Sequence, residues 1–144
     1  MSEYELQTVV LDPGSGVFKA GYAGNEYPSK SFQTVVGLPH LYNETSINER
    51  RTKFLKKLSG ENVEVDEQYI VGDEALNSRH DHMLSYPMKR GIVSDWDQME
   101  FIFEYAFLDL LKIVPEETLA LITEPALTST KNREKTAEFL FDVF

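Results

Sequence analysis

The sequence predicts an α/β fold in which helices flank a mixed β-sheet. Short apolar runs separated by turn residues fill the first 36 residues, a pattern typical of antiparallel strands in a β-meander. The second half instead holds a long amphipathic segment, a short apolar run and another amphipathic segment. A late strand that lies parallel to the first one requires a right-handed crossover, so the predicted sheet is mixed.

The first part of the chain predicts short strands divided by turns. The strands are expected near residues 6–12, 16–22, 31–36 and 69–71. Asn25 and Pro28 interrupt the apolar pattern between the second and third strands.

Residues 38–69 differ in composition and predict a small inserted domain with an exposed loop. Four apolar residues there predict a short amphipathic helix: Ile47, Phe54, Leu55 and Leu58. A basic group accompanies them: Arg50, Arg51, Lys53, Lys56 and Lys57. We interpret the basic group as a solvated helix face rather than a binding patch.

The clearest helix is predicted over residues 95–111, with Ser94 as its N-cap. Asp95 and Asp97 lie in its first turn, where the helix dipole favours anions. Its apolar residues recur at helical spacing: Trp96, Met99, Phe103, Ala106, Phe107 and Leu110.

The apolar run 118–123 predicts a strand buried on both faces, and residues 132–144 predict a last helix. The expected apolar face of that helix consists of Ala137, Leu140, Phe141 and Phe144. A strand buried on both faces belongs inside a sheet. We therefore expect the remainder of a longer chain, or a partner chain, to complete the sheet.

Charge and composition exclude several classes of protein. The formal net charge of -10 argues against a nucleic-acid surface and against adsorption to anionic lipid. The absence of cysteine excludes disulfides and thiolate metal sites. The acidic start lacks the features of a signal peptide, and no apolar run reaches membrane-spanning length. We expect a cytosolic or nuclear protein with no direct nucleic-acid or membrane partner.

The richest chemistry lies in the expected hairpin around Asp12 and Lys19. Gly14 and Gly16 are conformationally permissive and can present backbone N–H groups to an anion, while Ser15 adds a hydroxyl donor. Lys19 supplies positive charge, whereas Asp12 would repel an anion unless a divalent metal stood between them. The residues alone leave two interpretations open: a turn without a ligand, and a clasp for a metal-bound nucleotide phosphate.

Four segments resemble the opening part of actin and the actin-related proteins: VVLDPGSGVFKAGYAG, YIVGDEA, YPMKRGIVSDWDQME and LITEPALTSTKNREKTAEFLF. They follow the family's order from Thr8 to Phe144. The resemblance implies an actin-like, RNase-H-like fold that binds ATP or ADP with Mg²⁺ or Ca²⁺ between two lobes. This chain would form the N-terminal part of one lobe: an incomplete outer domain at 1–37 and 70–144, and the inserted domain at 38–69.

The resemblance also assigns roles and favours phosphate binding over a turn without a ligand. Asp12 matches the carboxylate that faces the metal through water, and Lys19 matches the phosphate-contacting lysine. Gly14, Ser15 and Gly16 match the turn that binds the β- and γ-phosphates. A full-length family member would be a slow ATPase. We expect no catalytic residue in this segment, because the water-positioning glutamine and the adenine pocket come later in the family.

Departures from conventional actin favour an actin-related protein. Pro13 replaces the usual asparagine and removes an N–H from the turn, and Arg90 replaces the modified histidine. The Thr123-Glu124-Pro125 pattern and the long inserted segment point the same way. His80-Asp81-His82 could be drawn as a metal pair, but we interpret it as an exposed polar turn.

Two functions remain open. One is an ATP-binding cytoskeletal protein that forms or nucleates filaments with other actin-like subunits and actin-binding proteins. The other is a nucleotide-holding scaffold subunit of a larger complex such as a chromatin remodeller. A sugar or acetate kinase on the same core is disfavoured by the DWDQME and TEPAL segments.

Overall fold

The computed structural model describes residues 6–39, 56, 59–61 and 69–144. Its main sheet has four strands in the order β3-β2-β1-β9. These strands are β1 (Thr8–Pro13), β2 (Val17–Tyr22), β3 (Lys30–Gln33) and β9 (Leu119–Ile122). The first three are antiparallel, whereas β9 lies parallel to β1. The expected mixed α/β sheet is therefore confirmed.

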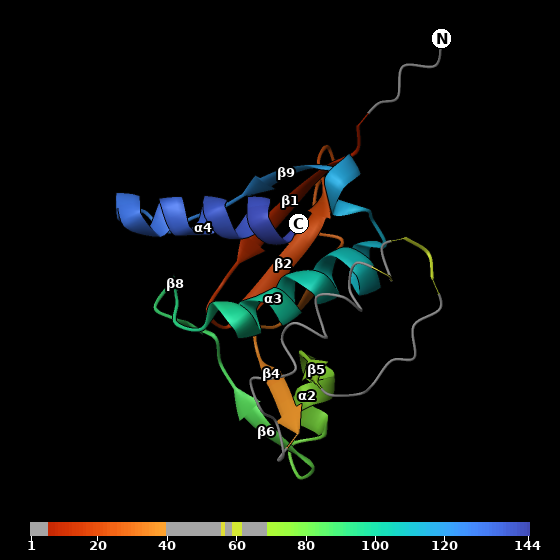
Figure 1. Cartoon of the computed structure of the whole chain (residues 1–144), viewed down its shortest axis with the longest axis vertical. Helices are drawn as coiled ribbons and strands as arrows, with labels where there is room; N and C mark the ends of the chain where they lie inside the picture. The colour runs from red at the N-terminus through yellow and green to blue at the C-terminus, as the bar shows by residue number, and fades with distance from the viewer. Residues whose placement is uncertain (1–5, 40–55, 57–58, 62–68) are drawn as a thin grey trace.

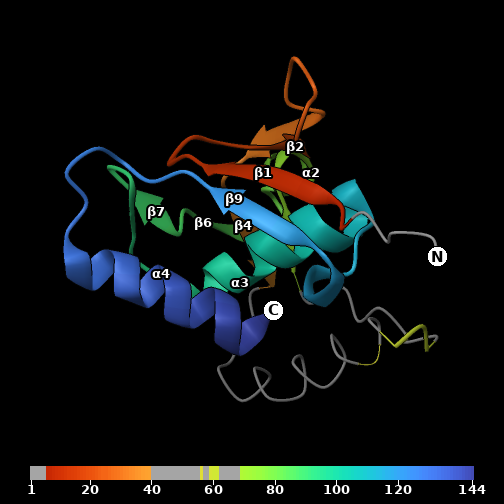
Figure 2. The same cartoon turned by 90° about the horizontal axis from the view of Figure 1, so that it is seen from above.

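Two helical segments cover one face of the main sheet (Figures 1 and 2). They are α3 (Trp96–Glu104), which continues as the π-helix η1 (Tyr105–Leu111), and α4 (Thr130–Val143). The core lies between this helical layer and the inward residues of β1 and β2, including Leu11 and Phe18. The ring of Phe18 meets that of Phe103 edge to face at 5.4 Å.

The N-cap of α3 is Asp95, so the prediction of Ser94 was wrong by one residue. The Asp95 carboxylate accepts a 3.0 Å hydrogen bond from the Gln98 N–H. Ser94 instead donates its hydroxyl to the Pro87 carbonyl at 3.1 Å. Asp95 has the extended backbone that a cap requires, with φ -140° and ψ 102°.

The strand predicted at 31–36 is divided between two sheets. The chain leaves β3 at Gln33 and begins β4 (Val36–Pro39) three residues later, so residues 34 and 35 are the crossing point. The second sheet has the order β5-β4-β6, with β5 at Ile70–Val71 and β6 at His82–Ser85. The short helix α2 (Asp73–Asn77) connects β5 and β6. The helix predicted around Ile47 to Leu58 and most of the basic group lie outside the described residues.

A hairpin of two short strands leads into α3. It consists of β7 (Met88–Lys89) and β8 (Ile92–Val93). The two residues of its turn both have positive φ, 53° at Arg90 and 77° at Gly91. Such a two-residue turn is typical of tight hairpins. A 3₁₀ turn, η2 (Pro115–Glu117), precedes β9.

The strand β9 is not buried on both faces, contrary to the sequence prediction. Leu119 is 54% exposed and Leu121 61% exposed. Within the described part of the chain, β1 is the only strand that pairs with β9. The exposed residues lie where no described element covers the sheet.

The buried residue of α4 is Phe139, which the sequence analysis did not select. Its ring lies 5.0 Å from Trp96 and 5.6 Å from Phe103. Phe141, an expected core residue, is 89% exposed, and Ala137 is also exposed. The helix α4 packs on the core with a different face from the predicted one, so Phe139 lies against α3. The ring centroid of Phe144 lies 5.2 Å from that of Phe107. No helix in the described residues combines the length and apolarity needed to cross a membrane.

Candidate phosphate-binding site

The turn between β1 and β2 has room for glycine but not for a side chain at its first position. A Cβ on Gly14 would collide with the carbonyl oxygen of Val17, whereas a Cβ on Gly16 would meet nothing within 4 Å. Neither residue is among the described glycines with positive φ. Neither glycine is therefore needed for a left-handed backbone, and the presentation of their N–H groups to an anion stays a prediction. Gly14 is needed for space, and Gly16 leaves the open side of the turn unobstructed.

A buried threonine, Thr34, anchors the turn by donating hydrogen bonds to two carbonyl groups of the turn. The Thr34 hydroxyl donates to the Gly14 carbonyl at 2.7 Å, and the Thr34 N–H donates to the Gly16 carbonyl at 3.0 Å. Thr34 is only 1% exposed. Thr34 was not predicted as a site residue, and the sequence gives little signal for it, because Gln33 and Thr34 are both polar between Phe32 and Val35.

The N–H groups of the turn remain available for an incoming anion. Among the described residues, no turn or loop hydrogen bond is donated by the N–H groups of Gly14, Ser15 or Gly16. Consecutive N–H groups in a tight turn form a concavity that attracts phosphate oxygens.

Ser15 links the turn to the β7–β8 hairpin. Its Oγ accepts a 2.7 Å hydrogen bond from the N–H of Gly91. Because the oxygen acts as acceptor in that bond, the hydroxyl hydrogen stays free to donate. Ser15 can therefore hold the hairpin and an anion at the same time.

Asp12 and Lys19 lie opposite each other on β1 and β2, on the same face of the sheet. Lys19 Nζ is 3.9 Å from Asp12 Oδ2, with both side chains about half exposed. An exposed ion pair at this distance is weak. Each group is thus available to a ligand, and the sequence-predicted residues are brought together at one end of the sheet.

A residue that follows a third strand, β9, also forms a hydrogen bond with the Asp12 carboxylate. The hydroxyl of Thr123, just after β9, donates to Asp12 Oδ1 at 2.5 Å. Thr123 entered the sequence analysis as part of a family pattern and not as a site residue. Its role depends on the parallel pairing of β1 and β9, which joins residues 111 positions apart.

The donor set around Asp12 fits a divalent metal that is held jointly with a nucleotide. No group of three or more His, Asp or Glu side chains within the described ranges could hold a metal ion by itself. Mg²⁺ commonly keeps several waters and binds one or two carboxylates together with the phosphates of a nucleotide. A single carboxylate beside a phosphate-type turn fits that mode.

His80 and Asp81 lie in an exposed turn, as expected, but His82 is the first residue of β6 and is only partly exposed, so the expectation was wrong for His82. The N–H groups of Asp81 and His82 both donate to the Ser78 carbonyl, at 3.0 and 3.1 Å. Backbone hydrogen bonds therefore hold residues 80–82 against the C-terminal end of α2.

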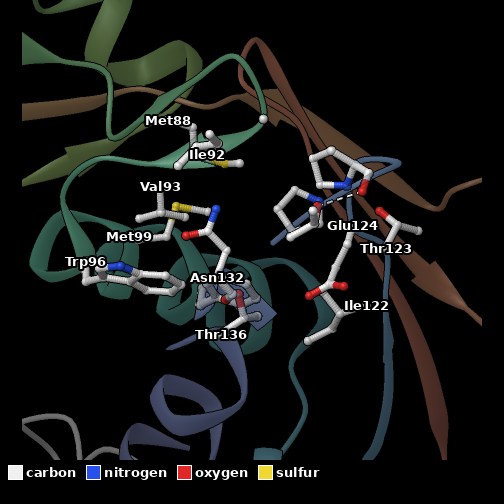
Figure 3. Close-up of a pocket in the computed structure, with 15 residues that line it drawn as sticks. Met88, Ile92, Val93, Trp96, Met99, Ile122, Thr123, Glu124, Asn132 and Thr136 are labelled. Atoms are coloured by element: carbon white, nitrogen blue, oxygen red, sulfur yellow. Dashed lines mark hydrogen bonds between the residues drawn. The ribbon is translucent and has the colours of Figure 1, made fainter. Parts of the chain in front are cut away.

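A small cavity of about 60 Å³ lies between the β7–β8 hairpin, the start of α3 and the segment that follows β9 (Figure 3). Pro13, Gly91 and Pro125 contribute to its wall, together with Trp96 and Met99 of α3. A Cβ on Gly91 would approach Pro125 Cγ to 2.6 Å, so the hairpin packs tightly against the β9–α4 connection. The cavity thus adjoins the end of β1, the β7–β8 hairpin, α3 and the β9–α4 connection.

Comparison with known proteins gives the family. The family model described as Actin matches residues 3–144. The chain belongs to the actin family.

Curated members of the actin family resemble this chain over almost its whole length. Actin-related protein 2 of Arabidopsis thaliana is 37% identical over 136 residues, which cover 94% of this chain and 31% of that protein. Actin-related protein 2 of Oryza sativa subsp. indica and that of subsp. japonica show the same identity and coverage. The chain therefore spans about a third of the length of these relatives. The similarity confirms the predicted resemblance to the actin-related proteins.

Proposed function

We propose that this chain is the N-terminal part of an actin-like, ATP-binding cytoskeletal protein that assembles into filaments or nucleates them. One observation carries the nucleotide part of the proposal: the anchored turn lies beside Asp12 and Lys19. Thr34 fixes the carbonyls of the turn, which leaves its N–H groups to an anion. Membership of the actin family supports the cytoskeletal part.

In this proposal, the turn binds the β- and γ-phosphates of ATP, or the β-phosphate of ADP. The N–H groups of Gly14 to Gly16 and the hydroxyl of Ser15 donate to phosphate oxygens, and Lys19 balances their charge. Asp12 faces Mg²⁺ or Ca²⁺ through water. The metal, when bound, neutralises phosphate charge and thereby removes the repulsion between Asp12 and the nucleotide.

We further propose that more protein covers β9. A groove of about 610 Å³ runs between β9 and α4, and its lining includes Leu119, Ile122 and Leu140. An exposed apolar strand edge is a template for pairing. The remainder of a longer actin-like chain is the proposed occupant, and a partner chain is the alternative. Other actin-like subunits and actin-binding proteins in the cytoplasm are the proposed partners of the whole protein.

A scaffold subunit that holds nucleotide is the second candidate, and Pro13 favours it. Proline has no N–H to donate, and its ring limits movement at the end of β1. Such a turn would hold phosphate with one donor fewer and respond less to a change of nucleotide. In this case the protein would belong to a larger complex, including one in the nucleus.

The test measures ATP affinity of the full-length protein with Mg²⁺ and with EDTA. Asp12→Ala should weaken Mg-ATP binding by about tenfold or more, because the metal loses its protein carboxylate. In EDTA the same substitution should strengthen ATP binding, because the repulsion between Asp12 and the phosphates is removed. Asp142→Ala, which removes an exposed carboxylate from α4, is the matched control. Equal Mg-ATP affinity of Asp12→Ala and the unaltered protein would overturn the proposal.

A further inference from the structure

The hydrogen bond from Thr123 to Asp12 joins the ends of two parallel strands beside the phosphate turn. We infer that Thr123 is a positioning residue, which holds the Asp12 carboxylate in the orientation that faces a nucleotide-bound metal. The inference rests on the proposed function, because Asp12 needs a fixed orientation only if it faces a metal.

The backbone places the Thr123 hydroxyl at the carboxylate. Leu11 and Ile122 are partners in the parallel register, and the Thr123 N–H donates to the Leu11 carbonyl at 3.0 Å. Thr123 and Asp12 are therefore neighbours one step beyond that pair. A β-branched side chain has few χ1 rotamers, so little freedom is lost when the hydroxyl is held in place.

The two oxygens of Asp12 have different partners. Oδ1 accepts the hydroxyl of Thr123 at 2.5 Å, while Oδ2 lies 3.9 Å from Lys19 Nζ. A hydroxyl-to-carboxylate bond of this length is at the short end of the charge-assisted range. Both contacts are exposed to solvent, but the 3.9 Å contact with Lys19 is too long for a hydrogen bond and so yields to a competing ligand. The threonine is thus the firmer of the two anchors.

Without the hydroxyl, the carboxylate is free to rotate toward Lys19. A closer pair would engage both charges that the proposed site needs, one for the metal and one for phosphate. Loss of the Thr123 hydroxyl should therefore weaken metal binding, because the carboxylate proposed to face the metal turns away from it. Residues that orient a metal-facing group typically contribute 10-fold to 100-fold to metal affinity.

The experiment uses the full-length protein and measures how ATP affinity depends on the concentration of Mg²⁺. Mn²⁺ in place of Mg²⁺ allows the bound metal to be followed by electron paramagnetic resonance. Thr123→Val keeps the shape of the side chain and removes the hydroxyl. We expect about a tenfold loss of apparent metal affinity and an altered Mn²⁺ spectrum. Thr123→Ser, which keeps the hydroxyl, should restore both.

Two controls separate positioning from packing. Thr118→Val removes a hydroxyl just before β9, where it donates to the Val114 carbonyl, and should leave metal affinity unchanged. In an Asp12→Ala background, Thr123→Val should cause no further loss, since the group that it positions is gone.

The possible outcomes distinguish failure of the proposed function from failure of the positioning role of Thr123. If Asp12→Ala has no effect, the proposed function fails. If Asp12→Ala weakens metal binding but Thr123→Val does not, only the positioning role fails. Equal losses in Thr123→Ser and Thr123→Val would also overturn the positioning role, because the effect would then follow packing of the strand end and not the hydroxyl.

Discussion

The N–H of Gly91 donates a 2.7 Å hydrogen bond to Ser15 Oγ, across 76 positions of sequence. This bond fixes the β7–β8 hairpin against the turn that carries the candidate phosphate donors. On its other side, Gly91 lies against Pro125 with no space for a side chain. Gly91 is thus held between two loops, and movement of any of the three segments must affect the others.

Gly91→Ala should destabilise the protein more than an alanine at a comparable glycine. Gly24 has a φ of 90°, similar to 77° at Gly91, but a Cβ there would meet nothing within 4 Å. Both substitutions incur the strain of positive φ, about 1–2 kcal/mol. Only Gly91→Ala adds a collision, expected to cost about 1–3 kcal/mol more. Urea unfolding of both variants measures the difference, and equal losses would contradict the tight packing at Pro125.

Thr34→Val should lower the free energy of unfolding by about 1–3 kcal/mol, because the substitution leaves the Gly14 carbonyl without its side-chain donor. Valine matches the shape of threonine, so packing is largely kept. Thr34→Ser, which retains the hydroxyl, should lose less. Denaturant midpoints distinguish the two variants. A valine variant as stable as the unaltered protein would show that the hydroxyl does not anchor the turn.

Residues 1–144 expressed alone should self-associate through β9. Leu119 and Leu121 are more than half exposed on a strand whose second edge is unpaired among the described residues. Leu121→Lys should reduce the association, since a charge on an edge strand opposes pairing. Sedimentation velocity and near-ultraviolet circular dichroism are the measurements. A monodisperse monomer that melts cooperatively would contradict the need for further protein at this edge.

Stability at alkaline pH should depend on Tyr105. Burial, followed by the nearby carboxylates of Asp109, Glu74 and Asp73, raises the pKa of the Tyr105 phenol above its usual 10.0. The folded protein therefore holds this proton more tightly than the unfolded chain. The corresponding stability is present below pH 10 and is lost as the pH rises through the folded pKa.

Tyr105→Phe removes this titration and should flatten the fall in unfolding free energy above pH 10. Denaturant unfolding between pH 8 and pH 11 provides the comparison. Tyr27→Phe is the control, because Tyr27 is 73% exposed. Parallel curves for Tyr105→Phe and the unaltered protein would contradict the prediction.

Local patterns were sufficient for much of the fold and for the central part of the candidate site. The apolar runs predicted β1 and β2, and the spacing from Trp96 to Leu110 predicted the long helical segment. The motif from Asp12 to Lys19 predicted a hairpin that brings those two side chains together, as β1 and β2 do. These features depend on residues that are close in sequence.

The missed features depend on contacts between distant segments. Thr34 became important because the chain crosses between sheets at that residue, which periodicity does not reveal. Thr123 reaches Asp12 only through the parallel pairing of β1 and β9. Phe139 and Phe141 differ in burial because of the phase with which α4 docks on α3, and two aromatic residues so close in sequence gave no basis for choosing.

The parallel pairing of β1 and β9 also affects the order of events during synthesis. Asp12 and Lys19 leave the ribosome early, but Thr123 follows Asp12 by 111 residues. At roughly 5–20 residues per second, translation needs roughly 5–20 seconds to cover that interval. During this time the hairpin exists without the strand that completes the surroundings of its carboxylate. Nucleotide is therefore expected to stabilise a late stage of folding rather than the first hairpin.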